Sequence, residues 1–161
     1  MCYQSSRMFG LSMEQKSFNF KMMQSLLPTR ERLARIGKIN SSDCLHCPLP
    51  TTHLLSCQLS TEVATPLLAC LRSFHPNVSS EDITIFNIET PEPMLLPIAW
   101  LISTCLAYIW EERNKGKPAL LSGLKAVLLS KINLLRDTKW RHYNLHNCAI
   151  LVEELINLYF S

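Results

Sequence analysis

The stretch 94-MLLPIAWLISTCLAYIW-110 is the longest apolar run of the chain and indicates its fold class. A helix that spans a membrane usually needs about 20 predominantly apolar residues. This run has only 17, and Pro97, Ser103 and Thr104 interrupt it. We therefore expect a buried helix at the centre of a helical domain. A small membrane protein anchored by this run is the less favoured alternative.

Apolar residues repeat at three- and four-residue spacing on both sides of this run, which is typical of helices with one buried face. The chain contains four Gly and nine Pro, and its apolar stretches are Leu-rich, which favours helices separated by Pro-containing turns. We predict an all-α fold with helices over 17–27, 28–39, 61–74, about 95–114, 118–139 and 143–160. Residues 83–88 fit either a helix or a short extended piece, and we leave them open.

The composition bounds the size and the surroundings of the fold. A chain of 161 residues with 47% apolar residues fits one compact domain. Charged residues make up 18%, below the roughly 25% that is usual for soluble domains. We expect either an unusually apolar interior or an apolar surface that meets a partner.

Cysteine usage indicates a reducing compartment. The chain has seven cysteines, an odd number, and residues 1–12 lack the apolar segment of a secretory signal. We therefore expect an intracellular protein, cytoplasmic or nuclear and not secreted, without a disulfide scaffold. Cys70, Cys105 and Cys148 lie in apolar helical patterns and are expected to pack in the core.

The segment 44-CLHCPLPTTHLLSC-57 carries the most specific motif. Cys44 and Cys47 can approach one ion from a tight turn, and His53 and Cys57, four residues apart, share a face of a helical turn. Four ligands close a tetrahedral site, so we expect one structural Zn²⁺. His46 competes as a ligand but is expected to point away. The alternative is an incidental or degenerate cluster that folds without metal.

Basic residues precede this cluster. Residues 1–57 carry seven Lys and Arg against three acids. Arg30, Arg32, Arg35 and Lys38 project from the helix predicted over 28–39 and form a broad basic rim. Such a rim is compatible with contact to phosphates, although an ordinary solvated helix face has the same pattern.

Two motifs together resemble a known family. Phe20-Lys21 and 27-LPTRERLARIG-37 run directly into the Cys44, Cys47, His53 and Cys57 cluster. This pattern resembles the zinc-binding domain at the C-terminal end of reverse transcriptases from non-LTR (LINE-like) retrotransposons. The resemblance covers about residues 17–75. The stretch 99-AWLISTCLAYIWEERNKGK-117 is similar to the helical extension that follows this domain in animal members.

The resemblance implies both an organisation and a role. It divides the chain into a poorly patterned segment (1–16), a zinc-binding region (17–75), a connector (76–94) and a helical extension (95–161). The family usually has four residues between the ligand His and the last Cys, and this chain has three, a spacing that a helical turn accommodates. The role it implies is binding of element RNA or target DNA, through Arg30, Arg32, Arg35 and Lys38, beside the polymerase portion of the parent polyprotein.

Catalysis is not expected. The chain has no Asp-Asp pair of the polymerase type, and its scattered acids form no paired-carboxylate endonuclease motif. We therefore expect a non-catalytic nucleic-acid-binding module, with a helical protein-interaction or scaffold domain as the alternative. Pairing of the arginines Arg30, Arg32 and Arg35 with acids would favour the scaffold, and free projection would favour nucleic acid.

Overall fold

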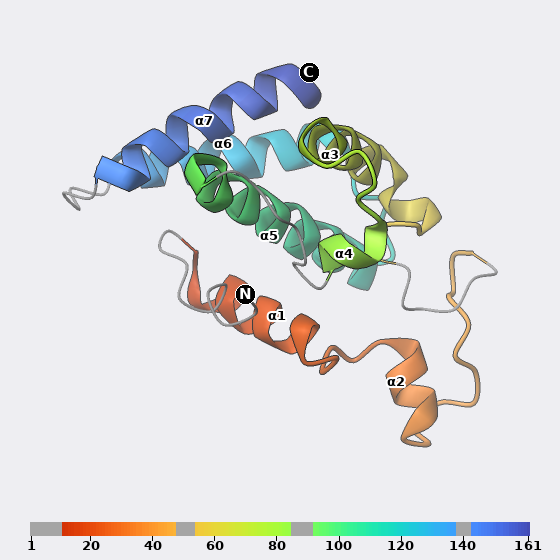
Figure 1. The fold of residues 1–161 in the computed structure, drawn as a ribbon. Coiled ribbons are helices and arrows are strands. Elements are labelled where there is room, and N and C mark those ends of the chain that lie inside the picture. Colours follow the sequence, from red (N-terminus) through yellow and green to blue (C-terminus); the bar gives the residue numbers. More distant parts are fainter. Residues whose placement is uncertain (1–10, 48–53, 85–91, 138–142) are drawn as a thin grey trace.

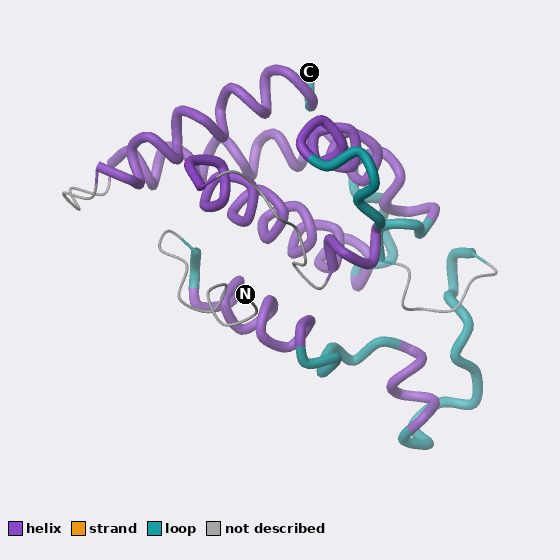
Figure 2. The backbone as a smooth tube through the Cα atoms, viewed as in Figure 1, coloured by secondary structure: helices purple, strands orange, loops and turns teal. Residues whose placement is uncertain are grey.

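The computed structural model describes residues 11–47, 54–84, 92–137 and 143–161, and every regular element in these ranges is a helix (Figure 1). Figure 2 shows helices joined by loops, without a strand in the described chain. This confirms the predicted all-α fold. The elements are α1 (Met13–Met23), α2 (Arg30–Arg35), the short 3₁₀ helix η2 (Gln58–Ser60), α3 (Thr61–Phe74), α4 (Ser80–Thr84), α5 (Glu92–Asn114), α6 (Leu121–Asp137) and α7 (Tyr143–Tyr159).

Helix α5 forms the centre of the core and packs against α1, α3, α6 and α7. Its segment Met94–Asn114 is long and apolar enough to cross a membrane, yet 56% of its most apolar window is buried within the domain. Trp100, Leu101 and Leu106 are among its fully buried side chains. Burial among four other helices is the environment of a core helix, as the interrupted apolar run predicts.

The three cysteines assigned to packing are all buried in this core. Burial raises the pKa of the Cys70 and Cys148 thiols to about 12, because a thiolate would lose its hydration there. The pKa of Cys105 is raised as well, by complete burial. These side chains act as small apolar groups, which confirms the prediction.

Helix α1 begins earlier than expected. It starts at Met13, within the segment predicted to be poorly patterned, because Ser12 and Gln15 form a capping box. The Ser12 Oγ accepts from the Gln15 backbone N–H and the Gln15 side chain accepts from the Ser12 N–H, both at 3.2 Å. This reciprocal pair satisfies two backbone donors that a helix start otherwise leaves open.

Buried polar pairs attach α1 to α5. The Gln15 Nε2 donates to Thr104 Oγ1 at 3.2 Å, and the Asn19 Nδ2 donates to Ser103 Oγ at 2.8 Å. All four side chains are buried, so each pair removes a desolvation cost that an unpartnered group would carry. The two polar residues that interrupt the apolar run of α5 are therefore the docking points for α1.

The apolar residues of the predicted helix over 17–27 repeat at three- and four-residue spacing, which predicts a wide apolar face, and only part of that face is buried. Phe18 is buried, with its ring centroid 6.4 Å from that of Trp110, but Phe20 is 50% exposed. Ile36, which ends α2, is also 56% exposed. The reason is that α1 buries the stripe of Gln15, Phe18 and Asn19, so the other apolar stripe faces solvent.

The helix boundaries agree with the predictions to different degrees. Helix α1 ends at Met23 instead of 27, and α2 covers only Arg30–Arg35 of the predicted 28–39. Helix α3 has the predicted bounds, whereas α5 begins at Glu92 and α6 at Leu121. The connector predicted over 76–94 contains α4, and Ile83, at the start of the undecided segment, belongs to that helix. Residues 85–88 lie outside the described chain. Gly37, in the turn after α2, has the positive φ of 71° that glycine adopts without strain.

Candidate metal centre

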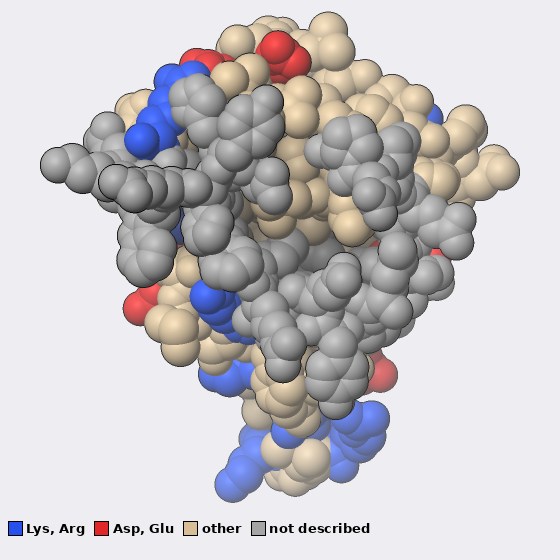
Figure 3. Space-filling model, turned by 60° about the vertical axis from the view of Figure 1, so that its left-hand side comes forward, with Lys and Arg blue, Asp and Glu red and all other residues tan. Residues whose placement is uncertain are grey.

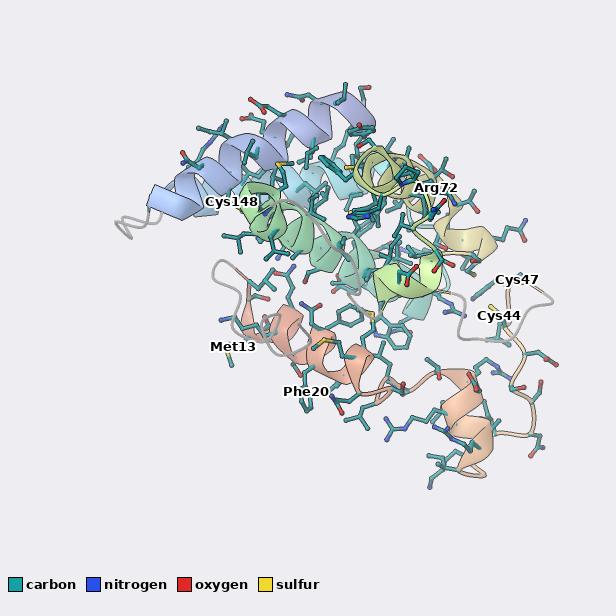
Figure 4. All side chains as sticks on the ribbon, in the orientation of Figure 1. Met13, Phe20, Cys44, Cys47, Arg72 and Cys148 are labelled. Atoms are coloured by element: carbon teal, nitrogen blue, oxygen red, sulfur yellow. The ribbon has the colours of Figure 1, made fainter. Side chains whose placement is uncertain are left out.

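Three cysteine sulfurs meet where the loop after α2 approaches the start of η2. The Sγ of Cys57 lies 3.9 Å from the Sγ of Cys44 and 3.9 Å from that of Cys47, and all three lie within 4.8 Å of one another. Figure 4 shows Cys44 and Cys47 on the same loop beside the helical core. A disulfide would need about 2.0 Å between sulfurs. A tetrahedral ion with Zn–S bonds of about 2.3 Å places its sulfurs about 3.8 Å apart. The observed spacing therefore fits three ligands of one tetrahedral metal ion.

The structure accounts for three of the four predicted ligands. His53 lies outside the described residues, so its part in the ligand set stays a prediction. His46 is described and half-buried, and it does not belong to the three-residue cluster. The thiols can hold a metal ion, and their soft sulfur donors favour ions such as Zn²⁺ or Cu⁺ over Mg²⁺ or Ca²⁺.

Cys57 is fixed on a rigid support. Its side chain is fully buried, and it immediately precedes η2. The Ser60 hydroxyl lies 2.7 Å from the carbonyl oxygen of Leu54 and 2.8 Å from that of Cys57, which closes the turn. The backbone N–H of Ala119 donates to the Leu59 carbonyl at 2.7 Å and connects this turn to the segment before α6. One ligand is thus placed by the core itself.

The other two ligands lie on a loop that Arg30 organises. The Arg30 Nε donates to the Asp43 carbonyl at 2.6 Å, and its Nη2 donates to the Ser41 carbonyl at 3.3 Å. The loop is also closed locally, because the Ser41 hydroxyl donates to Asp43 Oδ2 at 2.8 Å and accepts from the Asp43 N–H at 3.1 Å. Cys44 follows directly. Arg30, which is predicted to contact nucleic acid, therefore also supports this loop. We call residues 41–47 the metal loop.

Arg113 connects the metal loop to α5. It lies in the last turn of that helix, and its Nη2 donates to Cys44 Sγ at 3.3 Å. Sequence reasoning missed this residue, because no motif relates two positions 69 residues apart. Only a weak indication of a role for this residue is present in the sequence. Arg113 is a cation near the end of the predicted core helix, three residues before Gly116.

The thiols of the cluster differ in acidity. Burial opposes ionisation of Cys44, but hydrogen bonds from the His46 backbone and from Arg113 outweigh it and lower the pKa of Cys44 to about 7. Burial dominates at Cys57 and raises its pKa to about 11, and the neighbouring charge of Cys44 acts in the same direction. The Cys44 thiolate therefore forms readily. Ionisation of a second thiol beside it requires a bound cation that offsets the added negative charge.

The remaining predicted basic residues lie on α2 (Arg32 and Arg35) and in the turn after it (Lys38). Within the described parts of the chain, no ion pair or side-chain hydrogen bond engages Arg32, Arg35 or Lys38. Arg35 and Lys38 are exposed and Arg32 is half-buried. Figure 3 shows Lys and Arg side chains gathered over the protruding end of the molecule, where α2 lies. The four predicted residues are thus split between supporting the loop (Arg30) and facing solvent.

The three thiols of Cys44, Cys47 and Cys57 are placed so that they could hold one metal ion. These thiols come from one loop and one core turn, and Arg30 and Arg113 donate hydrogen bonds to that loop. A thiolate-rich centre of this kind fixes a loop that has little apolar content of its own. Comparisons of the chain with protein families, with curated proteins and with solved structures found no match.

Proposed function

We propose that this chain is a non-catalytic, zinc-stabilised nucleic-acid-binding module. The resemblance of residues 17–75 implies the same role and suggests an origin as the C-terminal piece of a retrotransposon reverse transcriptase, whose polymerase portion would be a further partner. The observation that carries the proposal is the juxtaposition of the three-thiol cluster and the basic helix α2, which Arg30 joins.

Zinc is the proposed ion, and its role is structural. Cys44, Cys47 and Cys57 have the sulfur spacing that a tetrahedral Zn²⁺ needs, and His53 is the proposed fourth ligand. A closed set of four protein ligands leaves no open position for water or substrate. Binding free energy then becomes folding free energy of the loop, on the order of 10 kcal/mol for structural zinc at neutral pH.

Nucleic acid is the proposed partner of α2. Arg32, Arg35 and Lys38 are not engaged by acids in the described chain, the condition under which a basic rim can contact phosphates. Phosphate contacts position a protein without reading sequence, and they release counterions, so we expect salt-dependent binding of RNA or DNA. Arg30 adds positive charge to the same basic rim while it supports the metal loop.

A protein-interaction role is the second candidate, and the outward face of α1 favours it. Met13 is 75% exposed and Phe20 50% exposed. Figure 4 shows both side chains on the side of α1 that faces away from α5. An apolar surface of this kind is typical of a contact with another protein. Under either proposal the reduced thiols fit an intracellular location, in the cytoplasm or the nucleus.

Salt-dependent binding distinguishes the two candidates. The triple variant R32A/R35A/K38A is compared with R72A/K117A/K125A, which removes the same charge from other elements, by fluorescence anisotropy with labelled single-stranded RNA and duplex DNA. We expect the α2 variant to lower the slope of log K against log salt by about 2, since each lost phosphate contact removes about 0.7–0.9. Equal affinities and slopes for the two variants would contradict the nucleic-acid proposal.

A further inference from the structure

We propose that Arg30 is a positioning residue that makes the placement of α2 depend on the metal centre. The inference rests on the metal ion of the proposed function, but it does not require nucleic acid as the partner. A series of contacts links α2 to the core. It runs from α2 through Arg30 and residues 41–43 to Cys44, and from Cys44 to the core.

Helix α2 has little of its own to hold it in place. It is six residues long and none of its residues is buried. Helices this short are marginal in water without tertiary packing. Figure 1 shows α2 apart from α3, α5, α6 and α7. Its orientation must therefore come from the segments that flank it and from the side chains that reach the neighbouring loop.

Arg30 supplies such a contact at the first residue of the helix. Its guanidinium donates through Nε to the Asp43 carbonyl and through Nη2 to the Ser41 carbonyl, so one side chain bridges two backbone acceptors. The planar fork of arginine permits this geometry, and the single ammonium of lysine does not reproduce it. The helix start and the loop are thereby fixed relative to each other.

The loop reaches the core through Cys44. Asp43 directly precedes Cys44, whose Sγ lies 3.9 Å from the buried Cys57 Sγ and 3.3 Å from Arg113 Nη2. Contacts between thiols at this distance are weak by themselves, whereas a bound metal joins the sulfurs by coordination bonds. Metal binding therefore fixes Cys44 to the Cys57 turn, and Arg30 carries that constraint to α2.

Hydrogen exchange with mass spectrometry tests this chain of contacts. Reduced full-length protein is compared with and without one equivalent of Zn²⁺, as wild type, R30A, R30K and the control R32A. In the wild type and in R32A we expect zinc to slow exchange of the backbone amides of 30–38 by roughly fivefold or more. In R30A zinc should still bind one to one and protect the turn at 54–60, but the protection of 30–38 should be lost; R30K should fall between.

Each other outcome has a distinct meaning. Zinc binding in the wild type without protection of 30–38, or equal protection in R30A and R32A, overturns the inference and leaves the metal site standing. If R30A no longer binds zinc, Arg30 is needed for the metal centre itself. This outcome also overturns the inference that Arg30 acts only on the placement of α2. A wild type that binds no zinc overturns both the inference and the metal part of the proposed function. Failure to bind nucleic acid contradicts only the nucleic-acid part of the proposed function.

Discussion

The Nη2 of Arg113 lies 3.3 Å from the Sγ of Cys44, although the two residues are 69 positions apart. This contact joins the end of the core helix α5 to the metal loop. It also brings a fixed positive charge to a cluster that becomes negative on ionisation. In the proposed zinc centre, three thiolates and a neutral histidine around Zn²⁺ would carry one net negative charge, which a guanidinium hydrogen bond to a ligand sulfur would offset.

Replacement of Arg113 should weaken metal binding. We expect R113A to lower zinc affinity by about 10-fold or more, as loss of an outer hydrogen bond to a ligand commonly does, and R113K to retain part of it. The measurement is competition with a chromophoric chelator. R72A, which removes an exposed arginine on α3, is the matched control, and an affinity of R113A equal to that of R72A would contradict the assignment (Figure 4).

Loss of a ligand should unfold the metal loop. C44S or C47S removes one coordination bond, and the loop then forfeits the metal's contribution to its folding. We expect chymotrypsin to cleave after Leu45, Leu54 and Leu55 much faster in these variants than in the wild type with zinc. C148A, which alters a buried cysteine of α7, is the control. Cleavage of C44S no faster than of C148A would show that the loop folds without the metal.

Thiol alkylation should follow the acidity and burial of the cysteines. After removal of metal, we expect iodoacetamide to modify Cys44 first among the cysteines of the described chain, with a rate that rises with pH around its pKa of about 7, because the thiolate is the reactive form. Cys70, Cys105 and Cys148 should stay unmodified in the folded protein, since burial raises the pKa of each. Peptide mapping by mass spectrometry measures the order. Modification of Cys70 as fast as Cys44 would contradict the described burial.

The packing of α5 against α6 leaves no room at Gly123. A Cβ on Gly123 would lie 2.2 Å from the Tyr108 hydroxyl oxygen, which donates to the Leu120 carbonyl at 3.1 Å. We expect G123A to lower the free energy of unfolding by roughly 1–2 kcal/mol, because overpacking exceeds the gain in helix propensity.

The variant Y108F/G123A, which also removes the hydroxyl, should regain part of that loss. Urea denaturation followed by circular dichroism measures the change, with S122A on the exposed neighbouring position as the control. If G123A proved as stable as S122A, the close approach of the two helices would be wrong.

Apolar periodicity predicted the helices whose buried faces are apolar. Val63, Leu67, Cys70 and Leu71 line one side of α3, and that helix has the predicted bounds. Periodicity failed for α1, because this helix attaches to α5 partly through Gln15 and Asn19. Polar residues buried in pairs carry no hydrophobic signal, so apolar spacing alone did not show which side of this helix packs against α5.

The clustering of the three thiols was predictable for a different reason. The short Cys44-x2-Cys47 spacing already restricts the two thiols to one turn, and Cys57 is near in sequence. The side chains that support the site were not predictable in this role. Arg30 was assigned by its charge alone, and Arg113 depends on how the end of α5 is placed by the packing of the whole domain.

Metal content of the purified, reduced protein tests the central claim most directly. Inductively coupled plasma mass spectrometry gives the stoichiometry, and Co²⁺ substitution gives the number of thiolate ligands from the sulfur-to-cobalt absorption bands. The account predicts one zinc per chain and a three-thiolate spectrum that changes to a two-thiolate spectrum in C57S. A reduced, folded protein without stoichiometric metal, or with cobalt bands unchanged in C57S, would contradict a metal centre at Cys44, Cys47 and Cys57.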